Sequence, residues 1–321
     1  KLRFLRGVCR SLAHKGKHVI TTKIEHAAML TTAKELEKDG FEFTFIGVDK
    51  EGFVDLEELK KAIRPDTILI SCMYANNEVG TIEPIKEIVE IAHSHGILCH
   101  TDAVQAMGAM RINVKDLGVD MMSFSAHKFN GPKGMGALFI KTGVPVGRLI
   151  SGGHQERTRR GGTTNVPGVV GFAEALRLTY ETLDEDVKHV AALRDRFVKR
   201  VLEEVPYVKF NGPKDMTKRL PNNADFSFEY IEGESILFSL DLAGIAVSSG
   251  SACSSGSLEP SHVLLAIGVP EELAHGSIRF TFGKENTEEE VDYTVEKIKE
   301  TVERLRKMSP LFKLDGTLKE V

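Results

Sequence analysis

Apolar segments of strand length alternate with segments of helical periodicity along the first half of the chain. The uncharged run 67–73 is typical of a buried strand, and shorter strands are expected at 18–22, 97–101 and 120–125. Between these strands, apolar positions recur every three or four residues, as they do in amphipathic helices. The alternation predicts an α/β fold with a mainly parallel sheet covered by helices.

The pattern changes near residue 184. A long helical stretch runs from Gly168 to about Val205, and we expect the acidic cluster Asp184–Asp186 to interrupt it and to separate two domains. Residues 1–184 are then a large domain, and residues 185–321 a smaller α+β domain. The strands expected in the smaller domain are 225–231, 245–248 and 277–282.

Composition narrows the class of protein. The chain has 321 residues, of which 41% are hydrophobic and 27% charged, with a net charge of −4, so disorder is not expected. No segment approaches the roughly 20 apolar residues of a membrane helix, and no polybasic tract suggests nucleic acid. Four cysteines are too few for a disulfide framework, which favours the cytoplasm, or the mitochondrial matrix in a eukaryote.

Two side chains that follow predicted strands suggest a cofactor. Ligands of parallel sheets bind beyond the carboxyl ends of the strands, where Asp102 and Lys128 are expected. Taken singly, Asp102 is as well explained as a helix N-cap, and Lys128 as a solvated loop residue. Together they match pyridoxal 5'-phosphate (PLP), whose aldehyde binds a lysine as a Schiff base while an acid stabilises the protonated pyridine nitrogen.

An arginine and a cysteine stand in unusual surroundings. Arg279 interrupts an otherwise apolar strand, which is costly unless a ligand carboxylate or a protein acid pairs with it. Cys253 lies in the Ser- and Gly-rich segment 248–257, whose composition indicates an exposed and mobile thiol. Such a thiol is either reactive or incidental to a flexible loop.

The other cysteines and nearby histidines have simpler explanations. Cys9, Cys72 and Cys99 occupy apolar positions and are expected to be inert core residues. The group around Cys99 does not have the spacing of a common zinc site, so no metal is expected. Its other members are His93, His95 and His100.

Five segments, in this order, resemble the cysteine desulfurases of the NifS/IscS type, in the aminotransferase class V superfamily of PLP fold type I. They are Glu25-His26, Asn76–Gly80 (NNEVG), Asp102–Gln105 (DAVQ), Ser125–Lys128 (SAHK) and Ser248–Cys253 (SSGSAC). The last is the most specific. The resemblance implies an enzyme that converts L-cysteine to L-alanine and holds the sulfur as a persulfide on Cys253. An iron–sulfur scaffold or another acceptor protein would then receive the sulfur.

The resemblance also implies roles around the cofactor ring. Lys128 would bind PLP and shuttle the substrate α-proton, and Asp102 would pair with the pyridine nitrogen. Gln105 and Asn77 would hydrogen-bond the ring hydroxyl oxygen. His26, which without the resemblance is best explained as a helix cap, would stack on the ring and serve in acid–base steps, including activation of the substrate thiol.

Phosphate and substrate would be bound by further residues. Ser125 and His127 would bind the phosphate, and Thr163 would reach the phosphate of the partner subunit in a homodimer. Arg279, together with Asn77, would bind the substrate carboxylate.

Such desulfurases also carry a phosphate-binding turn before the position that is Lys1 here, so we expect an N-terminal portion to be missing from this sequence. Two alternatives remain. The chain could be another class V enzyme, such as a selenocysteine lyase or an aminotransferase. It could also be a sulfur-transfer or scaffold protein without PLP activity.

Overall fold

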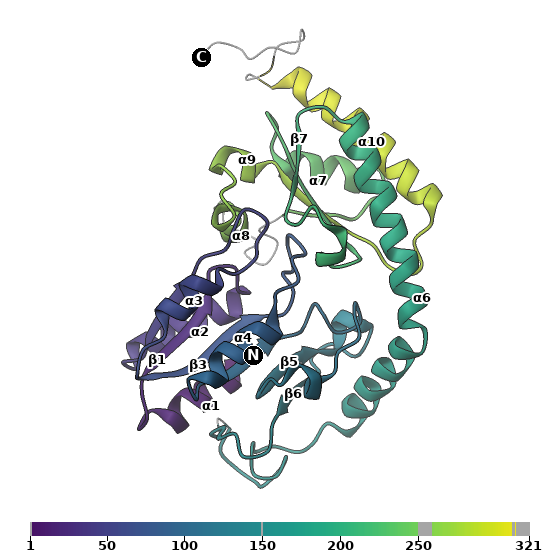
Figure 1. Cartoon of the computed structure of the whole chain (residues 1–321). Helices are drawn as coiled ribbons and strands as arrows, with labels where there is room; N and C mark the ends of the chain where they lie inside the picture. Colours follow the sequence, from purple (N-terminus) through teal and green to yellow (C-terminus); the bar gives the residue numbers. More distant parts are fainter. Residues whose placement is uncertain (1, 149, 250–258, 310–311, 313–321) are drawn as a thin grey trace. The chain divides into compact units, whose positions relative to one another are not determined.

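The computed structural model describes residues 2–148, 150–249, 259–309 and 312 (Figure 1). The chain divides into two compact units. Unit 1 consists of residues 1–49, 53–76 and 82–183, and unit 2 of residues 50–52, 77–81 and 184–321. Two short segments from the first quarter of the chain therefore belong to the unit built mainly from its C-terminal part.

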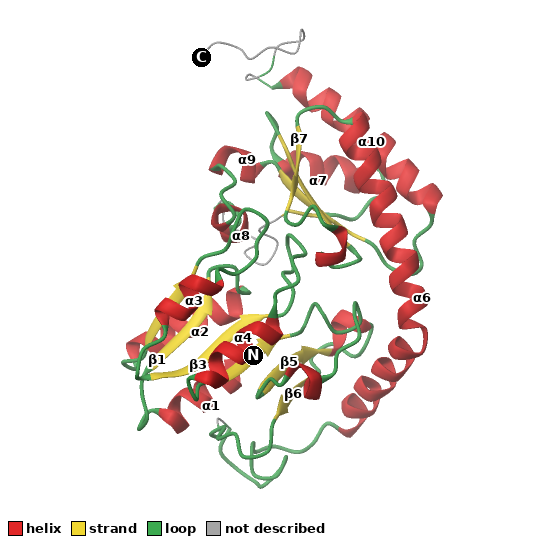
Figure 2. Ribbon diagram, in the orientation of Figure 1, coloured by secondary structure: helices red, strands yellow, loops and turns green. Residues whose placement is uncertain are grey.

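Unit 1 contains a six-stranded sheet in the order β2-β1-β3-β4-β5-β6 (Figure 2). Neighbouring strands from β2 to β5 are parallel, and β6 runs antiparallel to β5. The predicted α/β fold with a mainly parallel sheet is thus confirmed. The strands are β1 (His18–Thr22), β2 (Glu42–Ile46), β3 (Thr67–Met73), β4 (Leu98–Asp102), β5 (Met121–Ser125) and β6 (Gly136–Ile140).

Helices of unit 1 pack apolar faces against this sheet. Phe4, Leu5 and Val8 of the first helix are buried in one cluster with Val19 of β1 and Leu69 of β3. Every residue of β3 is buried, as its uncharged sequence predicts. The helices are α1 (Leu2–Leu12), α2 (Ala27–Lys38), α3 (Leu56–Ala62), α4 (Ile85–Ser94), α5 (Val114–Leu117) and the 3₁₀ turn η1 (Ala126–Phe129).

A single helix, α6 (Val166–Glu204), runs through the predicted domain boundary without a break (Figure 1). The expected interruption at Asp184–Asp186 is therefore wrong. The buried side chains Leu183, Val190 and Phe197 continue the apolar stripe past the acidic residues at helical spacing. Asp184 and Glu185 are exposed and Asp186 is half-buried, so none of the three acidic residues takes a position in the buried stripe.

Unit 2 contains a four-stranded sheet in the order β7-β8-β10-β9 with antiparallel pairing throughout. Its strands are β7 (Val208–Asn211), β8 (Asn223–Phe228), β9 (Ser248–Ser249) and β10 (Ser277–Thr281). Its helices, besides the end of α6, are the 3₁₀ turn η2 (Met216–Lys218), α7 (Gly233–Leu242), α8 (His262–Ala266), α9 (Glu271–His275) and α10 (Glu288–Met308). The sequence reading missed β7, a short edge strand with no clear alternation of buried positions.

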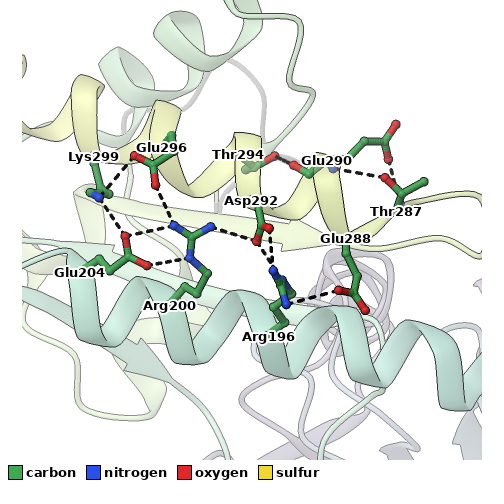
Figure 3. A network of polar contacts seen from close by, with 10 residues as sticks. All are labelled: Arg196, Arg200, Glu204, Thr287, Glu288, Glu290, Asp292, Thr294, Glu296 and Lys299. Carbon is green, nitrogen blue, oxygen red and sulfur yellow. Dashed lines mark hydrogen bonds and ion pairs between the residues drawn. The ribbon is translucent and has the colours of Figure 1, made fainter.

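The two faces of this sheet differ in chemistry. One face carries Phe226, Ile278 and Phe280, which are buried in a cluster with Phe197 of α6 and Val295 of α10. On their solvent side, α6 and α10 are joined by a network of ion pairs (Figure 3). The opposite face carries buried polar residues, namely Asn211, Asn223, Asp225, Ser227 and Ser277. A buried polar face of this kind needs internal hydrogen-bond partners.

Candidate active site

Four adjacent parallel strands of unit 1 end at the same edge of the sheet. In the order β1-β3-β4-β5, they lead into the segments that contain His26, Asn76, Asp102 and Lys128. Met73 of β3 lies opposite Asp102 of β4, so the strand ends are in register. The fold therefore brings together, at the carboxyl edge, residues that are up to about a hundred positions apart in sequence.

Asp102 is the last residue of β4 and is buried. Its Oδ1 atom accepts a hydrogen bond of 3.1 Å from the backbone N–H of Val104, and its carbonyl accepts one of 2.9 Å from Tyr74. The carboxyl group is thus held by the turn that follows the strand, which also contains the half-buried Gln105. The N-cap alternative is excluded, because no helix begins at Asp102.

Lys128 lies in η1, directly after β5, with Ser125 at the end of the strand and His127 beside it. Asn130 adopts a left-handed conformation with φ 62°, and the N–H of Gly131 bonds back to the Ala126 carbonyl at 2.9 Å. A Cβ atom at Gly131 would lie 2.9 Å from that of Ala126, so only glycine fits there. The lysine side chain is exposed on a turn that backbone hydrogen bonds hold in place.

The interior side of this turn is apolar. Ala126 and Phe129 are buried in a cluster with Met107, against which Phe172 and Tyr180 of α6 pack. The rings of Phe129 and Phe172 meet edge to face, with their centroids 5.3 Å apart. The first half of α6 therefore supports the turn that presents Lys128.

His26 follows β1 and is the N-cap of α2. Its Nδ1 atom accepts a hydrogen bond of 3.0 Å from the backbone N–H of Ala28. The turn before it is tied to the end of β3, since the N–H of Met73 donates to Glu25 Oε1 at 2.7 Å and Asn76 Nδ2 donates to the Ile24 carbonyl at 3.1 Å.

The donor set at this edge fits PLP. A buried carboxyl group suits the pyridine nitrogen, a primary amine suits the aldehyde, and the imidazole of His26 offers a flat surface to the ring. Ser125, at the N-cap of η1, and His127, within η1, offer a hydroxyl and an imidazole for a phosphate. Thr163 is exposed, in the segment that precedes α6.

Two further predicted residues, Asn77 and Arg279, belong to unit 2 and contact each other there. Nη1 of Arg279 donates a hydrogen bond of 2.7 Å to the Asn77 carbonyl. Arg279 lies in a polar row across the sheet, in which Asn211 opposes Asp225, Asp225 opposes Arg279, and Arg279 opposes Ser248. The row lies on the buried polar face of the sheet.

The guanidinium of Arg279 retains binding capacity. Its Nε atom is buried and has no hydrogen-bond partner among the described residues. Although Asp225 lies opposite, no described carboxylate is within ion-pair distance of the guanidinium, so the buried ion pair expected as an alternative is not formed. An arginine offers two parallel N–H bonds to a carboxylate, and the Nε side remains available for this purpose.

Glu78 and Asp225, which the sequence did not single out, interact electrostatically with this arginine, and Ser261 contacts Glu78. Burial raises the pKa of Asp225 to about 7, against the lowering effect of a hydrogen bond from Asn211 and of nearby arginine charges. Burial likewise raises the pKa of Glu78 to about 7, although Ser261 donates a hydrogen bond to it. Glu78 follows Asn77 in the motif Asn76–Gly80, which was the available signal.

Cys253 lies outside the described residues. The other three cysteines are buried, as predicted. Burial raises the pKa of the Cys9 thiol to about 12 and also raises the pKa values of Cys72 and Cys99. These thiols are therefore protonated and poor nucleophiles at neutral pH.

The histidines near Cys99 have protein partners. His93 Nε2 lies 2.9 Å from Asp120 Oδ2, and the ring nitrogens of His100 contact Ser71 and Ser123 at 2.9 and 2.8 Å. Within the described residues, no group of three or more potential ligands is arranged to hold a metal ion.

Comparison with known proteins identifies the family of the chain. The aminotransferase class-V family matches residues 4–294. A cysteine desulfurase IscS of Clostridium botulinum is 53% identical over 308 residues, covering 96% of this chain and 78% of the relative, and an IscS of Dictyoglomus turgidum is 54% identical over 306 residues, covering 95% and 77%. A solved structure titled NifS-like protein has a TM-score of 0.87 and 42% identity, covering 95% of this chain and 80% of that one.

The chain therefore belongs to the aminotransferase class-V family, whose enzymes depend on PLP, and its fold is PLP fold type I. Within that family, the resemblance to cysteine desulfurases of the NifS/IscS type is confirmed by these relatives. A further solved structure, titled SspA in complex with cysteine, has a TM-score of 0.72 and 31% identity, covering 88% of this chain and 78% of that one.

Proposed function

We propose that the chain is an L-cysteine desulfurase that supplies sulfur to acceptor proteins for iron–sulfur cluster assembly. The half-buried guanidinium of Arg279, whose Nε atom has no partner among the described residues, carries this proposal, because it provides a site for a small carboxylate. The identities to proteins named cysteine desulfurase, and the structure named as a cysteine complex, support cysteine as that carboxylate.

Each residue of the site has a specific task in this proposal. Lys128 binds PLP and moves the substrate α-proton, while Asp102 holds the pyridine nitrogen. PLP, when bound, supplies an electron sink for bonds that break at the substrate. Gln105 and Asn77 bind the ring hydroxyl oxygen, and His26 stacks on the ring.

Sulfur transfer is assigned to Cys253. Its thiolate attacks the substrate sulfur, and an S–S bond forms as the substrate C–S bond breaks. The substrate carbon receives the electron pair and a proton, so that one cysteine yields one alanine and one enzyme persulfide. The persulfide then passes its outer sulfur to the thiol of an acceptor protein.

The chain is also proposed to form a homodimer. Ser125 and His127 bind the cofactor phosphate, and Thr163 contributes to the phosphate site of the partner subunit. Directly after Thr163, the start of α6 exposes Val166 and Val170, at 60% and 61%. Exposed apolar side chains grouped on one helix are typical of an interface. Light scattering at increasing concentrations tests the dimer.

Spectroscopy and mass spectrometry test the function. The chain, loaded with PLP, should show the absorbance of a lysine-bound cofactor, and borohydride should fix the cofactor to the Lys128 peptide. With L-cysteine and without reductant, the Cys253 peptide should gain the mass of one sulfur atom. Cys253→Ala should abolish alanine formation, whereas the buried-site control Cys9→Ala should not.

The outcomes separate the alternatives. Absence of a bound chromophore would contradict the PLP enzyme and favour a non-enzymatic sulfur carrier. If Cys253→Ala still forms alanine from L-selenocysteine but forms none from L-cysteine, the chain is a selenocysteine lyase.

A further inference from the structure

Asp225 lies beside Arg279 on the buried polar face of the sheet in unit 2. The two residues are directly opposite each other on the antiparallel strands β8 and β10, so their side chains leave the same face with Cβ atoms about 5 Å apart. Asp225 is fully buried, whereas Arg279 is half-buried. The carboxyl group is therefore shielded from water, yet close enough to respond to any charge that binds to the guanidinium.

One oxygen atom of Asp225 has no donor to stabilise a negative charge. Oδ1 accepts a hydrogen bond of 2.8 Å from Asn211 Nδ2, but Oδ2 is buried and has no hydrogen-bond partner among the described residues. A buried charge of this kind is costly, and protonation removes the cost. Burial accordingly raises the pKa of Asp225 to about 7. Asp225 can therefore change its charge near neutral pH.

The charged groups around Asp225 balance one another before a ligand binds. Arg219 and Arg279 attract its carboxyl group, and Glu78 repels it. Burial lowers the pKa of Arg219 to about 9, so Arg219 remains positive at neutral pH. A ligand carboxylate on Arg279 would place a third acid beside these two cations. A buried site compensates such an excess of negative charge most readily by protonating one of its acids.

Asp225 and Glu78 differ in how easily they lose their charge. Oε2 of Glu78 accepts a hydrogen bond from the hydroxyl of Ser261, which favours the ionised form. Oδ2 of Asp225 has no comparable donor in the described part of the chain. Asp225 is also the acid that lies directly opposite Arg279. A negative charge that arrives at Arg279 therefore acts first on Asp225.

We propose that Asp225 is a positioning residue whose carboxyl group takes up a proton when a substrate carboxylate binds to Arg279. The protonated group keeps its place beside the guanidinium without competing for its charge. Ionised Asp225 does compete, so the affinity for the carboxylate falls as pH rises above the pKa of Asp225. That the carboxylate belongs to L-cysteine rests on the proposed function, whereas the coupling is a property of the Arg279 site itself.

Propionate is the probe for this coupling, because it has a carboxylate but neither the amine nor the thiol of cysteine. It stays ionised from about pH 6 to about pH 9. Calorimetry with the PLP-loaded chain measures its dissociation constant, and Arg279→Gln should weaken binding at every pH. For the parent chain, we expect the constant to rise about tenfold between about pH 7 and about pH 8.5. For Asp225→Asn, which has no charge to lose, it should change by less than about twofold.

Calorimetry in two buffers with different heats of ionisation counts the protons that binding takes up. Near pH 7.5, the parent chain should take up about half a proton or more per propionate, and Asp225→Asn should take up none. Glu78→Gln is the matched control, since it removes the other buried acid near Arg279, and it should keep the proton uptake. A purely structural role for Asp225 would shift the affinity equally at every pH and leave the proton count unchanged.

Absence of proton uptake in the parent chain, or of any propionate binding, would overturn the proposal. Uptake that is lost in Glu78→Gln but kept in Asp225→Asn would overturn it as well, by assigning the proton to Glu78. A parent chain that shows the coupling but forms no alanine from L-cysteine would refute the proposed function alone. Circular dichroism and bound-PLP absorbance verify the fold of each variant, and the proton count of the parent decides without them.

Discussion

Arg279 and Asp225 oppose each other on neighbouring strands, yet each keeps one buried polar atom without a described partner, Nε and Oδ2 respectively. Their remaining contacts are made elsewhere, to the Asn77 carbonyl and to Asn211. Buried polar atoms that lack partners are costly, and they persist where function requires them. We attribute this arrangement to the need for an arginine that is positioned but not neutralised.

The raised pKa of Asp225 predicts how Asp225→Asn changes the pH dependence of stability. Because its pKa is about 7 when folded and near 4 when unfolded, the folded chain retains a proton between these values. The carboxyl's contribution to the free energy of unfolding therefore falls as pH rises through this window. The uncharged side chain of Asp225→Asn does not titrate. The free energy of unfolding of the variant, relative to that of the parent, should therefore rise by a few kcal/mol between about pH 4 and about pH 7.

Urea unfolding followed by circular dichroism measures the difference, since the chain has no tryptophan. The variant preserves the acceptor for Asn211, which limits other effects. A difference in free energy that does not change with pH would show that Asp225 is ionised throughout.

At the scale of elements, the ion pairs between α6 and α10 form one connected network and are not isolated surface pairs (Figure 3). Arg200 contacts Glu204 at 2.6 Å, Asp292 at 2.9 Å and Glu296 at 2.7 Å, and its side chain is 22% exposed. Lys299 also contacts Glu204, at 2.8 Å. Networks of this kind stabilise more than single exposed pairs do.

Arg200→Met should lower the free energy of unfolding by about 1 kcal/mol, because it leaves three acidic groups without their shared cation. Arg177→Met is the matched control on the same helix, since Arg177 pairs, among the residues that the structure describes, only with Glu174 and Glu181 and is 53% exposed. The control should leave stability unchanged. Chemical denaturation in low and high salt measures both, and equal effects would contradict a special role for the network.

Elements with a strong pattern could be predicted from the sequence. The limits of β1 and β3 match the expected strands, because apolar and β-branched residues fill both. The edge strand β7 could not be found, since packing against β8 and not its own pattern makes it a strand. The acidic residues 184–186 do not end α6, because the continuous apolar stripe, and not the local charge, determines its length.

Among the site residues, those that follow strands could be predicted, because parallel topology places strand ends together. Glu78 and Asp225 could not, since their importance depends on contacts that span 183 and 14 residues of sequence. No local pattern reports such contacts.

At the scale of the whole molecule, α6 supplies buried residues to the cores of both units, among them Leu183 in unit 1 and Phe197 in unit 2. The structural importance of α6 therefore lies in joining two separate cores through one continuous backbone.

No helix in the described part of the chain is long and apolar enough to cross a membrane.

Glu185→Pro should disrupt this continuity. Proline in a helix interior removes a backbone hydrogen bond and clashes with the preceding turn, at a cost of about 3 kcal/mol. We expect a lower midpoint of thermal unfolding and new proteolytic cleavage near residue 185. Glu185→Ala, at the same exposed position, should show neither change, and a protease-resistant proline variant would contradict the interpretation.

The placement of residues 77–81 in unit 2 has a consequence for the order of folding. Asn223 and Arg279 bind the carbonyls of Glu78 and Asn77 across 145 and 202 residues of sequence. During synthesis, this segment emerges from the ribosome long before the strands on which it packs. Contacts of such long range form slowly. The arginine site is therefore completed late, so a nascent chain cannot assemble the proposed carboxylate site until β10 has been made.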